Sequence, residues 1–398
     1  NEAQLRSLWE TSAEAEGFDV FISHTWATPG YQKFLSLLLS SYWHYAMAGW
    51  LLAAILLMIL YIFRLLPVFV LIRGAMPDYQ VDIPCGLWIF FVTFLSAVLG
   101  LFCAPYIASF SCRASRCFYD VACVNQVDPI QREHGIYGIG GFLALSQHLW
   151  ILWSPPYLSR LWCVSRWQII GSKGADLVFE IAAYRTANPR GKIKIQPLFV
   201  ERDILAAWPG VFVFIFTFVM SSTGSSIRLA AFSLSMFGLL PCVHVIRRGY
   251  REQEHMFADL ANFDLSAASC SSAFDRQFIL SAVSEWYGSL EDFTSFVRGA
   301  LKEELMETLL RSRVPLQYCV LSLSPIQAQQ LDFLCGLLNA GAPRDVIARF
   351  VLGQLMSVSM LAVCSMYFVF WLAKQFAQPR FESWILDYVQ TLLICVVW

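Results

Sequence analysis

Four polar residues stand at the ends of two short apolar runs. Ser23 ends the run at 18–23, where His24 and Thr25 follow it, and Asp120 lies at the end of a second run, 117–121. In a doubly wound parallel sheet, the carboxyl ends of the strands face the crevice that holds the ligand. The pattern therefore predicts a small-ligand site lined by these four side chains. The alternative for His24 is a capping or packing position in a loop.

The elements that must position these residues alternate between strand and helix. Apolar runs at 18–23, 117–121, 149–153 and 192–199 are typical of strands, the last because Lys alternates with Ile. Segments 31–41 and 135–146 fit intervening helices, and the polar segment 125–133 is expected to be a loop over the crevice. This order predicts an α/β fold with one parallel sheet.

An ordered set of short motifs lies on these elements. FDVFISH at 18–24, FYD at 118–120, ILWSPPYLSRLWC at 151–163 and FEI at 179–181 follow one another as they do in TIR domains. Residues 17–200 therefore resemble a TIR domain, and the chain also resembles algal multi-pass membrane proteins in which such a domain is interrupted by membrane spans. The resemblance implies a flavodoxin-like sheet. It also implies one of two roles, cleavage of NAD at the nicotinamide–ribose bond or self-association that scaffolds signalling partners.

The same resemblance assigns the catalytic carboxylate to Glu180, which would steady the oxocarbenium-like ribose as nicotinamide leaves. In this chain residues 165–178 separate Glu180 from the Trp162–Cys163 pair that should closely precede it. An insert that simply lengthened the helix would move Glu180 by ~21 Å and out of the crevice. An insert that loops out, which Gly171 and Gly174 would permit, returns Glu180 to the crevice. Both alternatives stay open, so a catalytically inactive domain is one expectation.

Composition places the chain in a membrane. Hydrophobic residues make up 57% of the sequence and charged residues 14%, and the mean hydropathy is +0.55. A net charge of −1 excludes a general nucleic-acid binder. The 12 cysteines show no zinc-site spacing and are expected to be reduced. The glycine cluster at 135–141 fits no phosphate-binding fingerprint. We expect no metal and no cofactor, with NAD entering only as a substrate.

Charge-free apolar runs divide the chain into alternating soluble and membrane segments. The predicted order is an N-terminal part of the TIR-like domain (1–44), a first hairpin (45–107), the main part of that domain (108–204), a second hairpin (205–246), a helical cytosolic region (247–350) and a truncated third hairpin (351–398). Arginines follow the second and fourth spans, at Arg113, Arg116, Arg247, Arg248 and Arg251. The positive-inside rule therefore places the TIR-like domain in the cytosol. A start without Met and an end inside an apolar run predict a fragment.

Several features leave alternatives. His244, near the end of the fourth span, is expected to lie at the membrane interface, with a pore or proton-relay role as the alternative. Residues 316–323 fit either a strand or a helix. A regulated transporter or channel is a further function class, although the spans carry few charges. The sequence predicts a membrane-tethered TIR-like signalling protein, whose partners are the lipid bilayer and a second copy of the chain.

Overall fold

The computed structural model describes residues 2–26, 28–73, 81–111, 115–154, 176–221, 228–265, 273–311 and 315–398. The chain folds into two compact units. The first comprises Asn1–Phe34, Cys112–Phe199 and Glu252–Arg313, and the second comprises Leu35–Ser111, Val200–Arg251 and Val314–Trp398. The segment 247–350, expected as one helical region, is therefore shared between them.

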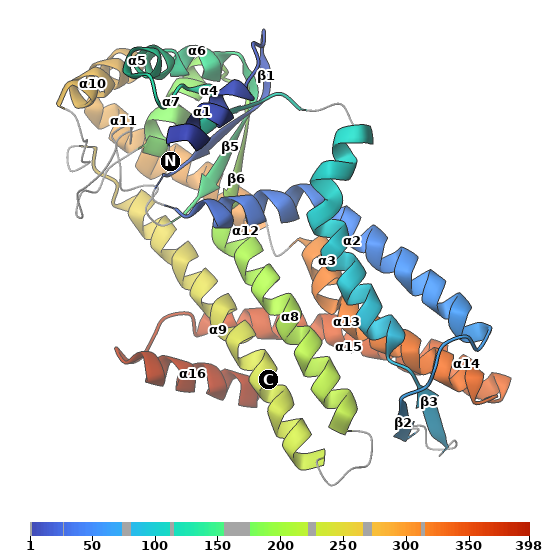
Figure 1. The fold of residues 1–398 in the computed structure, drawn as a ribbon. Helices are drawn as coiled ribbons and strands as arrows, with labels where there is room; N and C mark the ends of the chain where they lie inside the picture. The colour runs from blue at the N-terminus through green and yellow to red at the C-terminus, as the bar shows by residue number, and fades with distance from the viewer. Residues whose placement is uncertain are drawn as a thin grey trace. The chain divides into compact units, whose positions relative to one another are not determined.

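The first unit is built on a sheet of four parallel strands, part of which is visible in Figure 1. The strands are β1 (Phe18–His24), β4 (Cys117–Tyr119), β5 (Ser146–Trp153) and β6 (Lys192–Pro197), in the spatial order β4-β1-β5-β6. Phe21 pairs with Phe118 on one side and Leu149 on the other, and His24 pairs with Leu152. The predicted parallel sheet is confirmed. Its first strand joins the others although residues 25–116 separate it from β4 in sequence.

Aromatic and aliphatic side chains hold this sheet together. Phe21 stacks on Phe118 with ring centroids 4.6 Å apart, and Phe118 stacks in turn on Phe142. Leu149 and Ile151 on β5 are fully buried. These two residues are two positions apart on the strand. Trp150 lies between them, and the ammonium of Lys194 on β6 lies 3.9 Å from the centroid of its ring. One face of this part of the sheet is therefore apolar, as the alternating pattern of 192–199 predicts.

Nine helical segments among the described residues lie entirely within the first unit. They are α1 (Glu2–Glu10), α4 (Asp120–Cys123), α5 (Pro129–Tyr137), α6 (Ile139–Ala144), α7 (Asp176–Ala187), α10 (Ala273–Tyr287), α11 (Leu290–Phe296), η2 (Val297–Leu301) and α12 (Lys302–Arg311). Arg185 on α7 forms an ion pair with Glu304 on α12. That pair links the late helices of the chain to the helix between β5 and β6.

The structure differs from the sequence-based expectation between β4 and β5. Residues 135–146 form two helices rather than one, because α5 ends at Tyr137 and α6 starts at Ile139. Part of the expected loop at 125–133 is helical, since Asp128 accepts hydrogen bonds from Ile130 N and Gln131 N and so caps α5. Pro129 occupies the first turn, where its missing N–H costs nothing. Strand β5 starts at Ser146, three residues earlier than expected.

The second unit is helical, with one small antiparallel hairpin. It contains parts or all of α2 (Gly30–Ile62), α3 (Trp88–Ser111), α8 (Leu198–Ser221), α9 (Arg228–Ala261), α13 (Leu316–Asn339), α14 (Arg344–Arg349), η3 (Phe350–Leu355), α15 (Met356–Gln375) and α16 (Trp384–Val397), with β2 (Val70–Arg73) paired to β3 (Asp82–Cys85). Residues 316–323, which the sequence left between strand and helix, form the first turns of α13.

Four helices among the described residues are long and apolar enough to cross a membrane. They are Gly30–Ile62, Trp88–Ala108, Leu198–Ser221 and the continuous helical stretch Arg344–Gln375. They overlap the first, second, third and fifth predicted spans, and the first of them also includes the separate helix expected at 31–41. The sixth predicted span is the shorter apolar helix Trp384–Val397. The structure is thus compatible with a membrane protein, and the count of six spans stays a prediction.

Helices α2 and α3 approach each other through two glycines. A Cβ atom added at Gly49 would lie 2.6 Å from the carbonyl oxygen of Ser96, and one added at Gly100 would lie 2.6 Å from that of Tyr45. Backbones can come this close only where a side chain is missing, which is the usual way that helices pack inside a bilayer.

Candidate functional site

His24 and Asp120 meet at the carboxyl ends of adjacent strands of the first unit. His24 is the last residue of β1, and Asp120 follows the last residue of β4 and begins the short helix α4. His24 Nδ1 lies 3.4 Å from Asp120 Oδ1. Because β1 and β4 are parallel neighbours, their carboxyl ends lie at one edge of the sheet. The structure therefore brings together two of the four residues predicted to line the crevice.

Two hydrogen-bond donors hold the carboxylate of Asp120. The indole Nε1 of Trp26 donates to Oδ2 at 2.8 Å, and the backbone N–H of Val121 donates to Oδ1 at 2.8 Å. Burial raises the pKa of the Asp120 carboxyl to about 6, while these two hydrogen bonds and the charge of Lys33 act in the opposite direction. Asp120 therefore changes its charge close to physiological pH.

His24 is a neutral, enclosed imidazole. Its ring stacks on Tyr119 with centroids 4.8 Å apart, and its side chain is 1% exposed. Burial, followed by the charge of Lys33, lowers the pKa of His24 to about 3. Within the described part of the chain, neither ring nitrogen has a hydrogen-bond partner. His24 thus contacts Asp120 as a neutral ring, and its nitrogens can still pair with another group.

Lys33 supplies the positive charge of this site. It lies in the first turns of α2 and is 6% exposed, and its charge acts on both His24 and Asp120. Sequence reasoning missed Lys33 because it searched the strand ends. A signal was nevertheless present, since Lys33 is the only Asp, Glu, Lys or Arg in the sequence between Asp19 and Arg64. A single charged residue that follows a strand end in an otherwise apolar segment indicates that its charge is paired with another buried polar group.

The edge continues from β1 towards β5. Ser23 and Thr25 are both buried there. The hydroxyls of Thr28 and Ser154 form a 2.6 Å hydrogen bond that joins the segment after β1 to the residue following β5. When the strands are numbered along the chain, their spatial order in the sheet is second, first, third, fourth. The connection after β1 therefore leads to one side of the sheet, and the connection after β5 leads to the other. Ligands of open α/β sheets bind at such a switch point.

Glu180 lies on α7, which packs beside β5. The hydroxyl of Tyr184 donates to Gln147 O at 2.7 Å, and Asn188 Nδ2 donates to Ser146 O at 3.4 Å. These bonds tie the carboxyl end of α7 to the amino end of β5, so α7 runs antiparallel to the strands. Glu180 is one turn, ~6 Å, nearer the carboxyl edge than Tyr184. The catalytic role of Glu180 stays a prediction.

The insert before Glu180 falls mostly outside the described residues. Its last three residues, 176–178, are helical and continue without a break into Phe179 and Glu180. The described part of the insert therefore lengthens the amino end of α7. Residues 165–175, and the helix expected at 157–164, lie outside the described part.

Comparisons with protein-family models, with curated proteins and with solved structures found no match. Among the described residues, no group of three or more His, Cys, Asp or Glu side chains is arranged to hold a metal ion.

The chemistry of the edge suits a polar, phosphate-bearing ligand. A buried ammonium such as that of Lys33 attracts phosphate oxygens. Trp26, 42% exposed, offers an indole face on which a base can stack. Asp120 can accept a hydrogen bond from a hydroxyl group, as acidic residues do from ribose at dinucleotide sites.

Proposed function

We propose that this is a membrane-anchored, TIR-like signalling protein whose first unit binds NAD or a closely related dinucleotide. One observation carries the proposal: the parallel order β4-β1-β5-β6, with His24, Asp120 and Lys33 gathered at the carboxyl edge. Flavodoxin-like sheets have the same spatial order of strands, and they bind ligands at the carboxyl edge. The motif resemblance of residues 17–200 supports the same class independently of the geometry.

The proposal gives each side chain a role. Lys33 pairs with the pyrophosphate, Trp26 stacks on a base and Asp120 accepts from a ribose hydroxyl. The unpartnered imidazole of His24 exchanges a hydrogen bond with the ligand as a neutral group.

Cleavage of the bound dinucleotide is assigned to Glu180. Its carboxylate stabilises the developing positive charge on the ribose while the glycosidic bond breaks and the bonding electrons leave with neutral nicotinamide. Water then adds to the anomeric carbon and releases one proton to solvent. This step requires the amino end of α7 to bring Glu180 within reach of the edge. Binding without cleavage corresponds to the alternative role, a scaffold that acts by self-association.

The apolar helices supply the membrane anchor in this proposal. Four of them are long enough to cross a bilayer. Arginines next to the spans orient the first unit towards the cytosol.

The test uses the full chain purified in detergent. NAD is titrated while tryptophan fluorescence is recorded, and released nicotinamide is measured by chromatography. Lys33→Met should weaken binding at least tenfold. Lys192→Met, which removes an exposed lysine at the start of β6, is the matched control and should bind as the wild type does.

The two measurements separate the roles. Release of nicotinamide that Glu180→Gln abolishes supports the enzyme. Saturable binding with no release, together with association that depends on protein concentration, supports the scaffold. A folded protein that binds no dinucleotide, or that binds it equally well after Lys33→Met, would refute the proposed site.

A further inference from the structure

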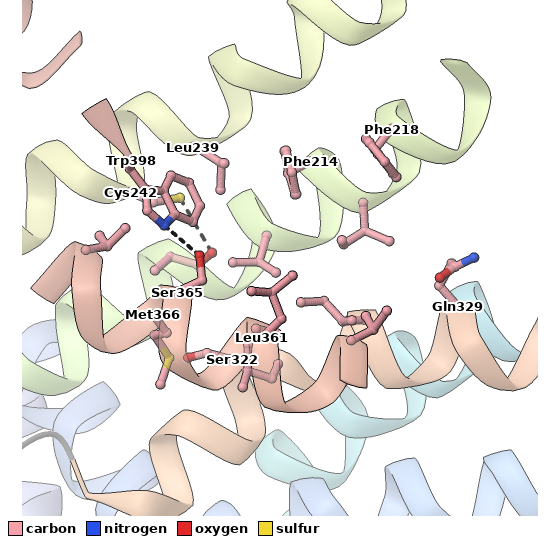
Figure 2. A pocket seen from close by; sticks show the side chains of 18 of the residues that line it. Phe214, Phe218, Leu239, Cys242, Ser322, Gln329, Leu361, Ser365, Met366 and Trp398 are labelled. Atoms are coloured by element: carbon pink, nitrogen blue, oxygen red, sulfur yellow. Dashed lines mark hydrogen bonds between the residues drawn. The ribbon is translucent and has the colours of Figure 1, made fainter. Parts of the chain in front are cut away.

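The second unit contains a cavity of about 620 Å³ between α8, α9, α13 and α15 (Figure 2). Its volume lies within the range of roughly 300–1,000 Å³ that small-molecule sites occupy. Figure 2 shows the side chains of Phe214, Leu239 and Leu361 around the same space. At one end, Trp398 Nε1 donates to Ser365 Oγ at 2.6 Å.

The walls are complete helix faces. Residues from α8 line the cavity at positions 204, 207, 211, 214, 215, 218 and 219, and residues from α15 line it at 358, 361, 362, 365, 366, 369 and 370. Both sets follow the spacing of one side of a helix. Two apolar faces of this kind normally interlock, because protein interiors are close-packed. Here they face a space large enough for a ligand.

The lining excludes a charged ligand. None of the described residues that line the cavity is Asp, Glu, Lys, Arg or His. An ionised group would have no partner there, and burying it without one is very costly. The occupant is therefore uncharged and mostly apolar.

Two polar atoms give the cavity a chemical preference. Ser322 and Gln330, both on α13, are each 6% exposed. Ser322 Oγ and Gln330 Oε1 have no hydrogen-bond partner among the described residues. The amide nitrogen of Gln330 donates to Gln329 Oε1 at 2.9 Å. The carbonyl oxygen of Gln330 itself is therefore the atom that can accept from a ligand. A buried acceptor without a donor is unfavourable, so a ligand hydroxyl that pairs with it gains affinity.

We propose that this cavity binds a neutral lipid alcohol, with its hydroxyl on Gln330 or Ser322 and its apolar body between α8 and α15. Both of these helices belong to stretches apolar enough to cross a bilayer, so the ligand can enter from the membrane. Sterols and acylglycerols share this chemistry. The site is separate from the carboxyl edge of the sheet and does not depend on the function proposed for it.

The test uses photoreactive analogues of a sterol and of a monoacylglycerol with the full chain in nanodiscs, and mass spectrometry locates the labelled residues. We expect saturable labelling on α13 or α15 that excess unlabelled sterol or monoacylglycerol suppresses, and the effective competitor identifies the source. Gln330→Leu, alone or with Ser322→Ala, should weaken binding about tenfold, the effect of losing one hydrogen bond.

Steric variants provide the matched control. Met366→Trp fills the cavity and should abolish labelling, whereas Met360→Trp, at an exposed position of the same helix, should leave it unchanged. Labelling that does not saturate, that neither competitor suppresses, or that is equal in wild type, Gln330→Leu and Met366→Trp would overturn the proposal. Gln330→Leu keeps the test decisive if Met366→Trp fails to fold.

Discussion

Arg247 on α9 and Asp387 on α16 form a buried ion pair, with Nη2 2.9 Å from Oδ1. The Arg247 side chain is 0% exposed. It also donates to Phe376 O at 2.8 Å and to Thr391 Oγ1 at 2.6 Å. Arg251 reaches the second carboxylate oxygen of Asp387 at 3.2 Å. A guanidinium this well bonded fixes α16 against α9.

Removing the carboxylate should be costly, because it leaves Arg247 buried without a counter-charge. Asp387→Ala is expected to lower the free energy of unfolding by about 3–5 kcal/mol. Asp345→Ala is the control, since Asp345 pairs with Arg349 on the exposed surface of α14 at 2.8 Å, and such pairs contribute less than about 1 kcal/mol. Thermal midpoints in detergent compare the two variants. Equal midpoints would show that the buried pair does not anchor α16.

The glycine contact between α2 and α3 makes a second prediction. In Gly49→Ala the new methyl group meets the carbonyl oxygen of Ser96, and only a shift of the helix backbones can relieve the overlap. We expect a loss of about 1–3 kcal/mol, as for other overpacked sites. Gly353→Ala, where no atom lies within 4 Å of the added Cβ, should be neutral or slightly stabilising. Loss of stability in both variants would point to backbone flexibility rather than helix contact.

Asp332 caps the start of α3 from inside the second unit. Its carboxylate accepts from the backbone N–H groups of Ile89 and Phe90, at 3.3 and 2.7 Å, and from the hydroxyl of Tyr61 at 3.0 Å. Asp332→Ala leaves three buried donors without an acceptor and should cost about 3 kcal/mol. Tyr61→Phe removes one donor to Asp332 and also the acceptor of the Gly86 backbone N–H, which lies 2.7 Å from the hydroxyl, and should cost about 2 kcal/mol. Asp332→Asn, which keeps one acceptor oxygen, should fall between them when all three are measured by thermal unfolding.

The sequence predicted the sheet well because strand signals are local. The motifs FDVFISH and FYD are short, apolar and rich in aromatic residues, and each becomes a strand of the expected sheet. The polar end residues His24 and Asp120 could be placed together because parallel strands end at the same edge. The start of β5 was missed, since Ser146 and His148 are not apolar. They join the strand by pairing with Phe18 and Val20.

The rest of the structure depends on contacts that local patterns do not record. His244, expected at the membrane interface, stacks on Tyr388 at 3.9 Å and lies 3.0 Å from Thr391 Oγ1. Its neighbours come from α16, far along the chain. The bond between Trp26 and Asp120 likewise joins residues 94 positions apart. A single sequence shows the two residues of such a contact, but it does not show that they contact each other.

The last prediction concerns the pH dependence of the carboxyl edge. The pKa of His24 is about 3 in the folded protein against an ordinary 6.5. Between pH 6.5 and 3 only the unfolded chain binds this proton, so His24 lowers stability as the pH falls. The pKa of Asp120 is about 6 against an ordinary 3.8. Between pH 6 and 3.8 only the folded chain holds that proton, so Asp120 raises stability as the pH falls. The two effects cancel where the windows overlap.

Removing one group of the pair should expose the effect of the other. In Asp120→Asn the free energy of unfolding, relative to wild type, is expected to fall by about 1.4 kcal/mol per pH unit from pH 6 to pH 4. In His24→Phe, which keeps an aromatic ring against Tyr119, it should rise with the same slope as the pH falls. Thermal or denaturant unfolding followed by tryptophan fluorescence at half-unit steps of pH measures both. Curves for the two variants that run parallel to that of the wild type would mean that neither group is perturbed by burial at this edge.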